Sequence, residues 1–126
     1  MSSSDLDHIF GQIKALMTPY EHGSIKARID TDTRYELWFE KELVADGRKR
    51  NDVYFAGLII QSKYVGFYYM PVYIEPEMKT FFQPELLKML KGKSCFHIKK
   101  LDGALKLQIA EALEKGYKLY EARGWV

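Results

Sequence analysis

Five apolar segments, each bounded by a short polar loop, most constrain what this chain can fold into. Residues 25–29 and 35–39 alternate apolar and polar side chains, as half-buried strands do. Residues 53–61 and 64–74 are instead dense in β-branched and aromatic residues and suit the centre of a sheet. The fifth segment, 94–100, is short. Because strands joined by short loops run antiparallel, these segments predict a mainly antiparallel sheet of about five strands.

Helical patterns lie on both sides of the strand segments. Apolar residues recur at helical spacing over residues 5–18 and again after Asp102, which predicts an N-terminal helix and a C-terminal helix capped by that aspartate. Short helices are expected between the last two strands, one beginning at Glu75 and one at Pro84. The sequence therefore predicts a single α+β domain over residues 1–126, in which N- and C-terminal helices flank the sheet.

Composition and motifs narrow the class of protein. The chain of 126 residues has one cysteine, so it cannot form an internal disulfide. No segment approaches the ~18 apolar residues that span a bilayer, and "MSSSDLDH" lacks the basic start and apolar core of a secretory signal. We therefore expect a cytoplasmic protein with no membrane partner. The chain has no GxSxG, GxGxxG or P-loop pattern, which favours a binding protein over an enzyme.

Charge is distributed unevenly along the chain, although the net charge is only +2. Residues 1–52 hold ten acids against eight bases, whereas residues 53–126 hold seven acids against eleven bases. The stretch 88–106 alone has six lysines and one aspartate. This asymmetry has two interpretations, which are lysines solvated around helix ends and a surface that prefers anions.

The basic turn "GRKR" supplies a second candidate for anion binding. Its Arg48, Lys49 and Arg50 project from a polar loop between two strand segments. Lysine and arginine engage phosphate, and aromatics such as Trp38 can stack on bases. A nucleic-acid- or anion-binding module built on this turn and on the segment 88–106 is therefore the alternative function. Basic residues at a hairpin tip are more often simply solvated, so nucleic acid is not the leading partner.

The only cysteine, Cys95, lies two positions before His97 in "GKSCFHIKK". On a strand these two side chains share one face, while Phe96 and Ile98 point to the other and are expected in the core. Two ligands are too few for a tight metal site, and covalent catalysis would need a direct Cys–His contact and a third, orienting group. No catalytic residue is therefore predicted.

A run of tyrosines lies in the fourth strand segment. Alternation places Tyr64 and Tyr68 on one face and Phe67 on the other. Large side chains on both faces indicate a strand that is buried on both sides, that forms a homodimer through an aromatic sheet face, or that lines a small-molecule groove. If there is a groove, Tyr64 and Tyr68 line it, with Cys95 and His97 at its floor.

Three stretches of the second half resemble the YdhG-like domain of unknown function: "SKYVGFYYMPVYIEPEM", "PELLKMLKGKSCFHIKKLD" and "EKGYKLYEARGWV". The resemblance covers roughly residues 50–126, and "GKSCFHIKK" and the strand ending in "MPVY" are its most specific parts. It implies a small α+β domain with a helix-flanked antiparallel sheet, similar in outline to frataxin.

The same resemblance implies a function, because some members of this broad family are described as frataxin-like iron chaperones. Frataxin-type iron binding uses acids on the first helix and the neighbouring strand. The acids of this chain that come nearest to that pattern are Asp5, Asp7, Asp30 and Asp32. The leading expectation is a small intracellular binding protein that handles iron or a small ligand, with iron as the one cofactor considered.

Overall fold

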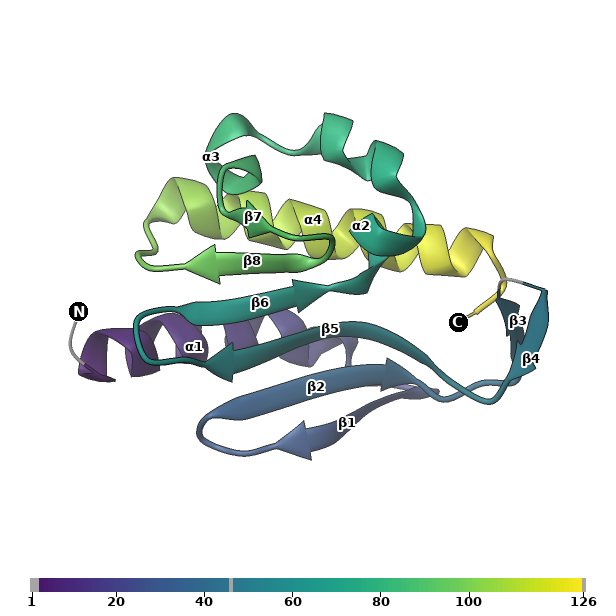
Figure 1. Ribbon diagram of the computed structural model, residues 1–126. Helices are drawn as coiled ribbons and strands as arrows, with labels where there is room; N and C mark the ends of the chain where they lie inside the picture. The colour runs from purple at the N-terminus through teal and green to yellow at the C-terminus, as the bar shows by residue number, and fades with distance from the viewer. Residues whose placement is uncertain (1–2, 46, 126) are drawn as a thin grey trace.

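The computed structural model describes residues 3–45 and 47–125, and its centre is one antiparallel sheet (Figure 1). The six strands of this sheet are, in spatial order, β1 (Ile25–Asp30), β2 (Arg34–Phe39), β5 (Val53–Ile60), β6 (Val65–Tyr69), β8 (Cys95–Ile98) and β7 (Leu90–Lys91). Every neighbouring pair is antiparallel. The predicted α+β fold class is confirmed, and the strand beyond the expected five is the two-residue β7.

The remaining elements surround this sheet. The helices are α1 (Ser3–Met17), the 3₁₀ helix η1 (Thr18–Tyr20), α2 (Met70–Ile74), the 3₁₀ helix η2 (Pro76–Phe81), α3 (Pro84–Leu87) and α4 (Gly103–Ala122). Strands β3 (Leu43–Ala45) and β4 (Arg48–Arg50) form a separate two-stranded sheet. The predicted cap of α4 is confirmed, because the Asp102 carboxylate accepts a hydrogen bond from the Leu105 N–H at 2.8 Å. Among the described residues, no helix has the length and apolarity that crossing a bilayer requires.

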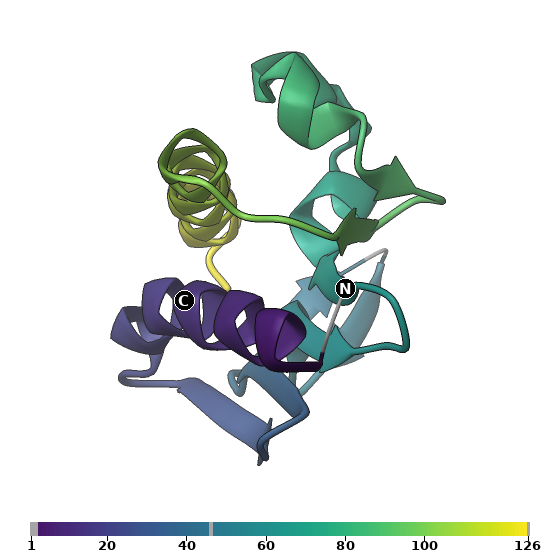
Figure 2. The same ribbon diagram turned by 90° about the vertical axis from the view of Figure 1, so that its left-hand side faces the viewer.

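Helices α1 and α4 lie against the same face of the sheet, while no helix of the described chain covers the other face (Figures 1 and 2). The strand side chains that point to the helices form the buried core: Ile25, Tyr35, Leu37, Phe39, Phe55, Leu58, Val65, Phe67, Tyr69, Phe96 and Ile98. We call the uncovered side the open face. Its half-buried side chains include Trp38, Tyr54, Tyr68, Cys95 and His97.

A glycine allows α4 to approach β6 closely. A Cβ on Gly116 would lie 2.5 Å from the Tyr69 hydroxyl oxygen and 2.8 Å from Pro71 Cγ. The Tyr69 hydroxyl donates a hydrogen bond to the Ala112 carbonyl of the same helix, which satisfies the polar end of a fully buried side chain. A larger residue at position 116 would have to push this buried contact apart.

The structure corrects the prediction of a continuous strand over residues 64–74. Strand β6 ends at Tyr69, and Met70–Ile74 forms helix α2. Pro71 explains the difference, because proline has no N–H for a sheet ladder and its fixed φ suits the first turn of a helix. The basic stretch Arg48–Arg50 also differs from its prediction as a turn, since it pairs with β3 as one arm of a hairpin.

Substituting Gly116 by alanine is expected to destabilise the protein, because the added methyl group overpacks the contact with Tyr69 and Pro71. The free energy of unfolding, measured by urea denaturation, should fall by about 1–3 kcal/mol despite the better helix propensity of alanine. Gly11 is the matched control, since it is exposed on α1 with open space around it. Gly11→Ala should stabilise the protein by about 0.5–1 kcal/mol. An equal gain in both variants would contradict the close packing of α4.

Candidate functional site

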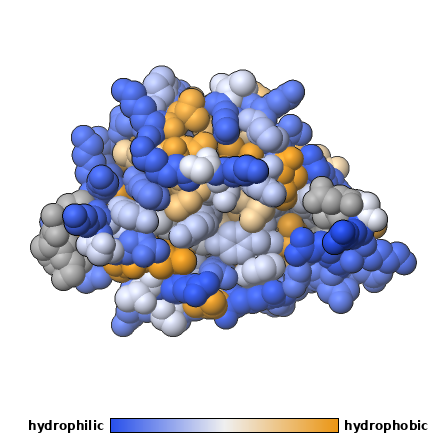
Figure 3. All heavy atoms as spheres, viewed as in Figure 1, coloured by the Kyte–Doolittle hydropathy of each residue, from blue (hydrophilic) through white to orange (hydrophobic). Residues whose placement is uncertain are grey.

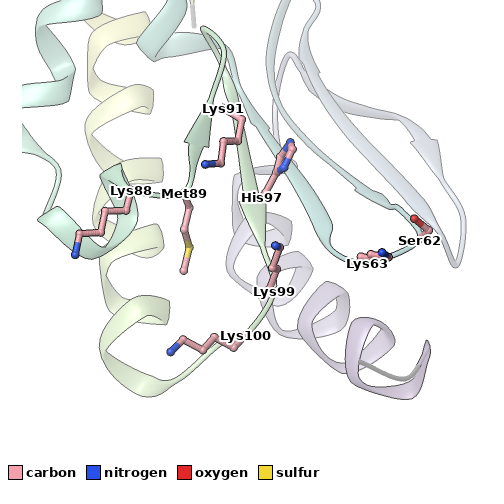
Figure 4. A pocket seen from close by; sticks show the side chains of 8 residues that line it. All are labelled: Ser62, Lys63, Lys88, Met89, Lys91, His97, Lys99 and Lys100. Atoms are coloured by element: carbon pink, nitrogen blue, oxygen red, sulfur yellow. The ribbon is translucent and has the colours of Figure 1, made fainter.

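A cavity of about 840 Å³ opens where the β5–β6 turn, β7 and the ends of α3 and β8 meet (Figure 4). Its lining is Ser62, Lys63, Lys88, Met89, Lys91, His97, Lys99 and Lys100. Because five of these eight residues are lysines, we call it the lysine cavity.

The β6–β8 pairing brings two sides of the lysine cavity together. Its register places Val65 opposite Ile98. The β5–β6 turn comes directly before Val65, and the chain leaves β8 directly after Ile98. Lys63 of the turn therefore lines the same cavity as Lys99 and Lys100 (Figure 4).

The β7–β8 pairing supplies the remaining side. Lys91 of β7 lies opposite Cys95 of β8, and the His97 N–H donates a hydrogen bond to the Met89 carbonyl at 2.9 Å. Lys88, the residue that follows α3, completes the lining. The site thus depends on the register of two strand pairs.

The lysine cavity concentrates positive charge. Within residues 3–45 and 47–125, no carboxylate lies within ion-pairing distance of any of its five lysines. Other lysines do have such partners, since Lys14 pairs with Asp30 and Lys118 pairs with Glu114. Like charges gathered in one place repel each other, so a bound anion would relieve an unfavourable electrostatic energy at this site.

His97 connects the lysine cavity to the open face. Burial lowers the pKa of His97 below its usual value, and the charges of Lys91 and Lys99 lower it further, so the imidazole is neutral at pH 7. The ring stacks on Tyr64, with 3.9 Å between ring centroids and 11° between ring planes. These two rings form a flat aromatic rim beside the lysines.

Tyrosine rings continue from this rim across the open face. Tyr68 lies opposite Cys95, and its ring leans over Gly66, where a Cβ would lie 3.0 Å from the ring carbon Cε2. Tyr54 leans over Gly57, where a Cβ would lie 2.0 Å from the tyrosine hydroxyl oxygen. Glycine at these two strand positions gives the rings room to lie along the sheet.

Trp38 extends this series to β2. Its ring packs edge-on against Tyr54 with 5.1 Å between centroids, and the Arg28 guanidinium lies 4.4 Å from its centroid. The middle of the open face is pale in Figure 3, which marks residues of intermediate hydropathy, and both hydrophilic and hydrophobic residues border it. We call the rings along this face the aromatic row: Trp38, Tyr54, Tyr68, Tyr64 and His97.

The structure brings together all four residues that the sequence predicts around a groove. Tyr64 stacks on His97, and Tyr68 pairs with Cys95 across β6 and β8. Phe96 is fully buried on the opposite side of β8, as alternation predicts. Burial raises the pKa of the Cys95 thiol, which is therefore protonated at pH 7 and a poor nucleophile.

The basic residues Arg48, Lys49 and Arg50 lie at the other end of the molecule. They form β4, which is far along the sheet from the β5–β6 turn (Figure 1). Arg50 is also 3.5 Å from the Asp52 carboxylate. The structure therefore does not join the predicted basic turn to the lysine-rich segment.

The acids that the family resemblance associates with iron are not gathered into one site. Asp5 and Asp7 lie on α1, Asp30 at the end of β1 pairs with Lys14, and Asp32 lies in the β1–β2 turn. In the part of the chain that the structure describes, no group of three or more His, Cys, Asp and Glu side chains could hold a metal ion. Iron handling stays a prediction from the resemblance, without an assembled ligand set among these residues.

Lys63 is a site residue that sequence reasoning missed. The lysine-rich segment 88–106 contains the other four lysines of the cavity, so composition alone draws attention to them. Lys63 belongs to a different segment and reaches the site only through the β6–β8 register. Nothing in the residue pattern specifies that register.

Comparison with known proteins identified no relative. No family model matches the chain, and neither a curated protein nor a solved structure matches it. The resemblance to the YdhG-like domain stays a prediction, and the function has to be inferred from the site.

Removing a cavity lysine should raise the pKa of His97, because fewer positive neighbours then oppose the imidazolium form. NMR titration of the His97 ring protons in Lys91→Gln and Lys99→Gln measures this. Lys118→Gln, on the outer surface of α4, is the control and should leave the His97 pKa unchanged. An unaltered His97 pKa in both cavity variants would show that the lysine charges do not act on this ring.

Proposed function

We propose that this protein binds phosphate-bearing anions and that the lysine cavity is the binding site. The observation that carries the proposal is that five lysines, four from the segment 88–106 and Lys63 from the β5–β6 turn, line one cavity without a pairing carboxylate among the described residues. Each ammonium group is a compact charge with three donors on a flexible stem. A cluster of such groups suits a ligand that presents many phosphate oxygens.

The local charge supports an anion over a metal ion as the ligand. Five ammonium groups repel a cation, and the neutral His97 is one nitrogen ligand where a tight site needs three or four. The net charge of the whole chain is only +2, so the attraction for anions is a property of this site and not of the protein as a whole.

The groups around the cavity support binding without catalysis. His97 is stacked on Tyr64, and the Cys95 thiol is protonated at pH 7. Catalysis of group transfer requires an activated nucleophile or a general base within hydrogen-bond reach of the reacting atoms. The protonated Cys95 thiol is not an activated nucleophile.

Binding of inorganic tripolyphosphate, measured by isothermal titration calorimetry, tests the proposal. The triple variant Lys88→Gln/Lys91→Gln/Lys99→Gln should bind about tenfold more weakly, since three exposed charge contacts contribute roughly 0.5 kcal/mol each. The affinity of the wild-type protein should fall as the salt concentration rises.

The matched control removes the same number of charges elsewhere. Lys79, Lys115 and Lys118 are exposed and lie outside the lysine cavity. Their triple substitution by glutamine should leave tripolyphosphate affinity close to that of the wild type. Equal weakening in the two triple variants, or no binding by the wild-type protein, would refute the proposal.

A further inference from the structure

We propose that the anion is single-stranded nucleic acid, whose phosphates lie in the lysine cavity and whose bases stack on the aromatic row. This inference rests on the proposed phosphate site and adds the class of ligand. Its basis is that the lysine cavity and the aromatic row adjoin each other, because His97 lines the cavity and is also stacked on Tyr64 in the aromatic row. A ligand that occupies both surfaces must carry phosphates and flat rings along one chain.

The aromatic row is long enough for several bases. Trp38, Tyr54, Tyr68 and His97 lie on β2, β5, β6 and β8, which are neighbours in the sheet. With about 4.8 Å between adjacent strands, the row extends over roughly 14 Å across the sheet, and it runs diagonally because Tyr68 lies opposite Gly57 and not opposite Tyr54. Proteins that bind single strands use such series of aromatic rings, on which successive bases stack whatever their sequence.

The fold leaves part of each ring accessible, although the Arg28 guanidinium lies over the Trp38 ring and Tyr64 and His97 stack on each other. Each ring of the aromatic row belongs to a half-buried residue on the side of the sheet that the described helices leave uncovered. Gly57 and Gly66 let Tyr54 and Tyr68 lie along the backbone. A ring in that position presents a face to a ligand from outside, whereas an upright ring would present its edge.

Carboxylates near Trp38 on the open face are already neutralised. Glu36 pairs with Arg34, Arg28 pairs with both Glu40 and Asp52, and Arg50 lies 3.5 Å from Asp52, so three acids face three arginines. A polyanion that crosses the open face therefore meets compensated acids at the β2 end and uncompensated lysines at the β8 end. The charge of the surface is complementary to a phosphate chain along this path.

Charge and geometry together favour a single strand over other occupants. Bases within a duplex are stacked on each other, so a duplex offers a protein phosphates and base edges, whereas unpaired bases have free ring faces. A second copy of this chain would bring a second cluster of lysines of the same sign to the interface. The aromatic face alone would suit such a homodimer, but the adjoining lysines oppose it.

Fluorescence anisotropy with three short labelled polymers of equal length tests the inference. The polymers are oligothymidylate DNA, oligouridylate RNA and a base-free deoxyribose-phosphate chain. DNA or RNA should bind about tenfold more tightly than the base-free chain, because stacked bases add to the phosphate contacts. The ratio of DNA to RNA affinity distinguishes the two sources of ligand, since only RNA has the 2′-hydroxyl.

Two matched double variants test whether the tyrosine rings cause the difference in affinity between the oligonucleotides and the base-free chain. Tyr64→Leu/Tyr68→Leu should lose about tenfold in affinity for the oligonucleotide and nothing for the base-free chain. Tyr64→Phe/Tyr68→Phe keeps both rings and should bind like the wild type.

The outcomes separate this inference from the proposed function. Equal affinity for the oligonucleotides and the base-free chain, with both lost in the lysine triple variant, would overturn nucleic-acid binding and leave phosphate binding standing. No binding of the three polymers or of tripolyphosphate would overturn both. A dimer in light scattering that Tyr64→Leu/Tyr68→Leu dissociates would assign the open face to a second copy and also overturn the inference.

Discussion

Helices α1 and α4 pack against one face of the six-stranded sheet, and this packing determines which of its side chains are buried. Because neighbouring strand residues alternate, a residue such as Phe67 points to the helices and Tyr68, the next one, points to the open face. Gly116 sets the approach of α4 to β6 at the buried Tyr69. If a strand shifted its register by one residue, its rings of the aromatic row would turn into the core and its core residues would be exposed. Stability and the proposed binding surface therefore depend on the same alternation.

The lysines of the cavity have one structural role that is independent of any ligand. Lysine on an edge strand discourages pairing with another chain, and Lys91 lies on β7, the last strand of the sheet. That role does not account for Lys63, which lies in the turn between two inner strands and lines the same cavity. Nor does it account for Lys99 and Lys100, which follow β8. The proposed attraction of a phosphate-bearing ligand would account for all of them.

Local patterns in the sequence predict most of the fold but only part of the site. Alternation and helical spacing are properties of neighbouring residues, so the α+β class, the Asp102 cap and the burial of Phe96 could all be predicted. The ending of β6 before Pro71 was missed because the apolar pattern continues through the proline. Lys63 was missed for a different reason, since strand register is set by contacts between distant residues. Alternation predicts that Tyr64 shares a face with Tyr68 and that Cys95 shares a face with His97. The pairing of β6 with β8 then brings these two pairs together.

Amide chemical-shift mapping of the ¹⁵N-labelled protein during titration with oligothymidylate tests the central claim most directly. If one strand of nucleic acid occupies the lysine cavity and the open face, the shifts concentrate in residues 62–68, 88–91 and 95–100 and in the Trp38 indole. The amide chemical shifts of β4 and of the solvent-facing side of α1 should not change. Shifts confined to Arg48–Arg50, or no shifts at saturating oligonucleotide and low salt, would contradict the account.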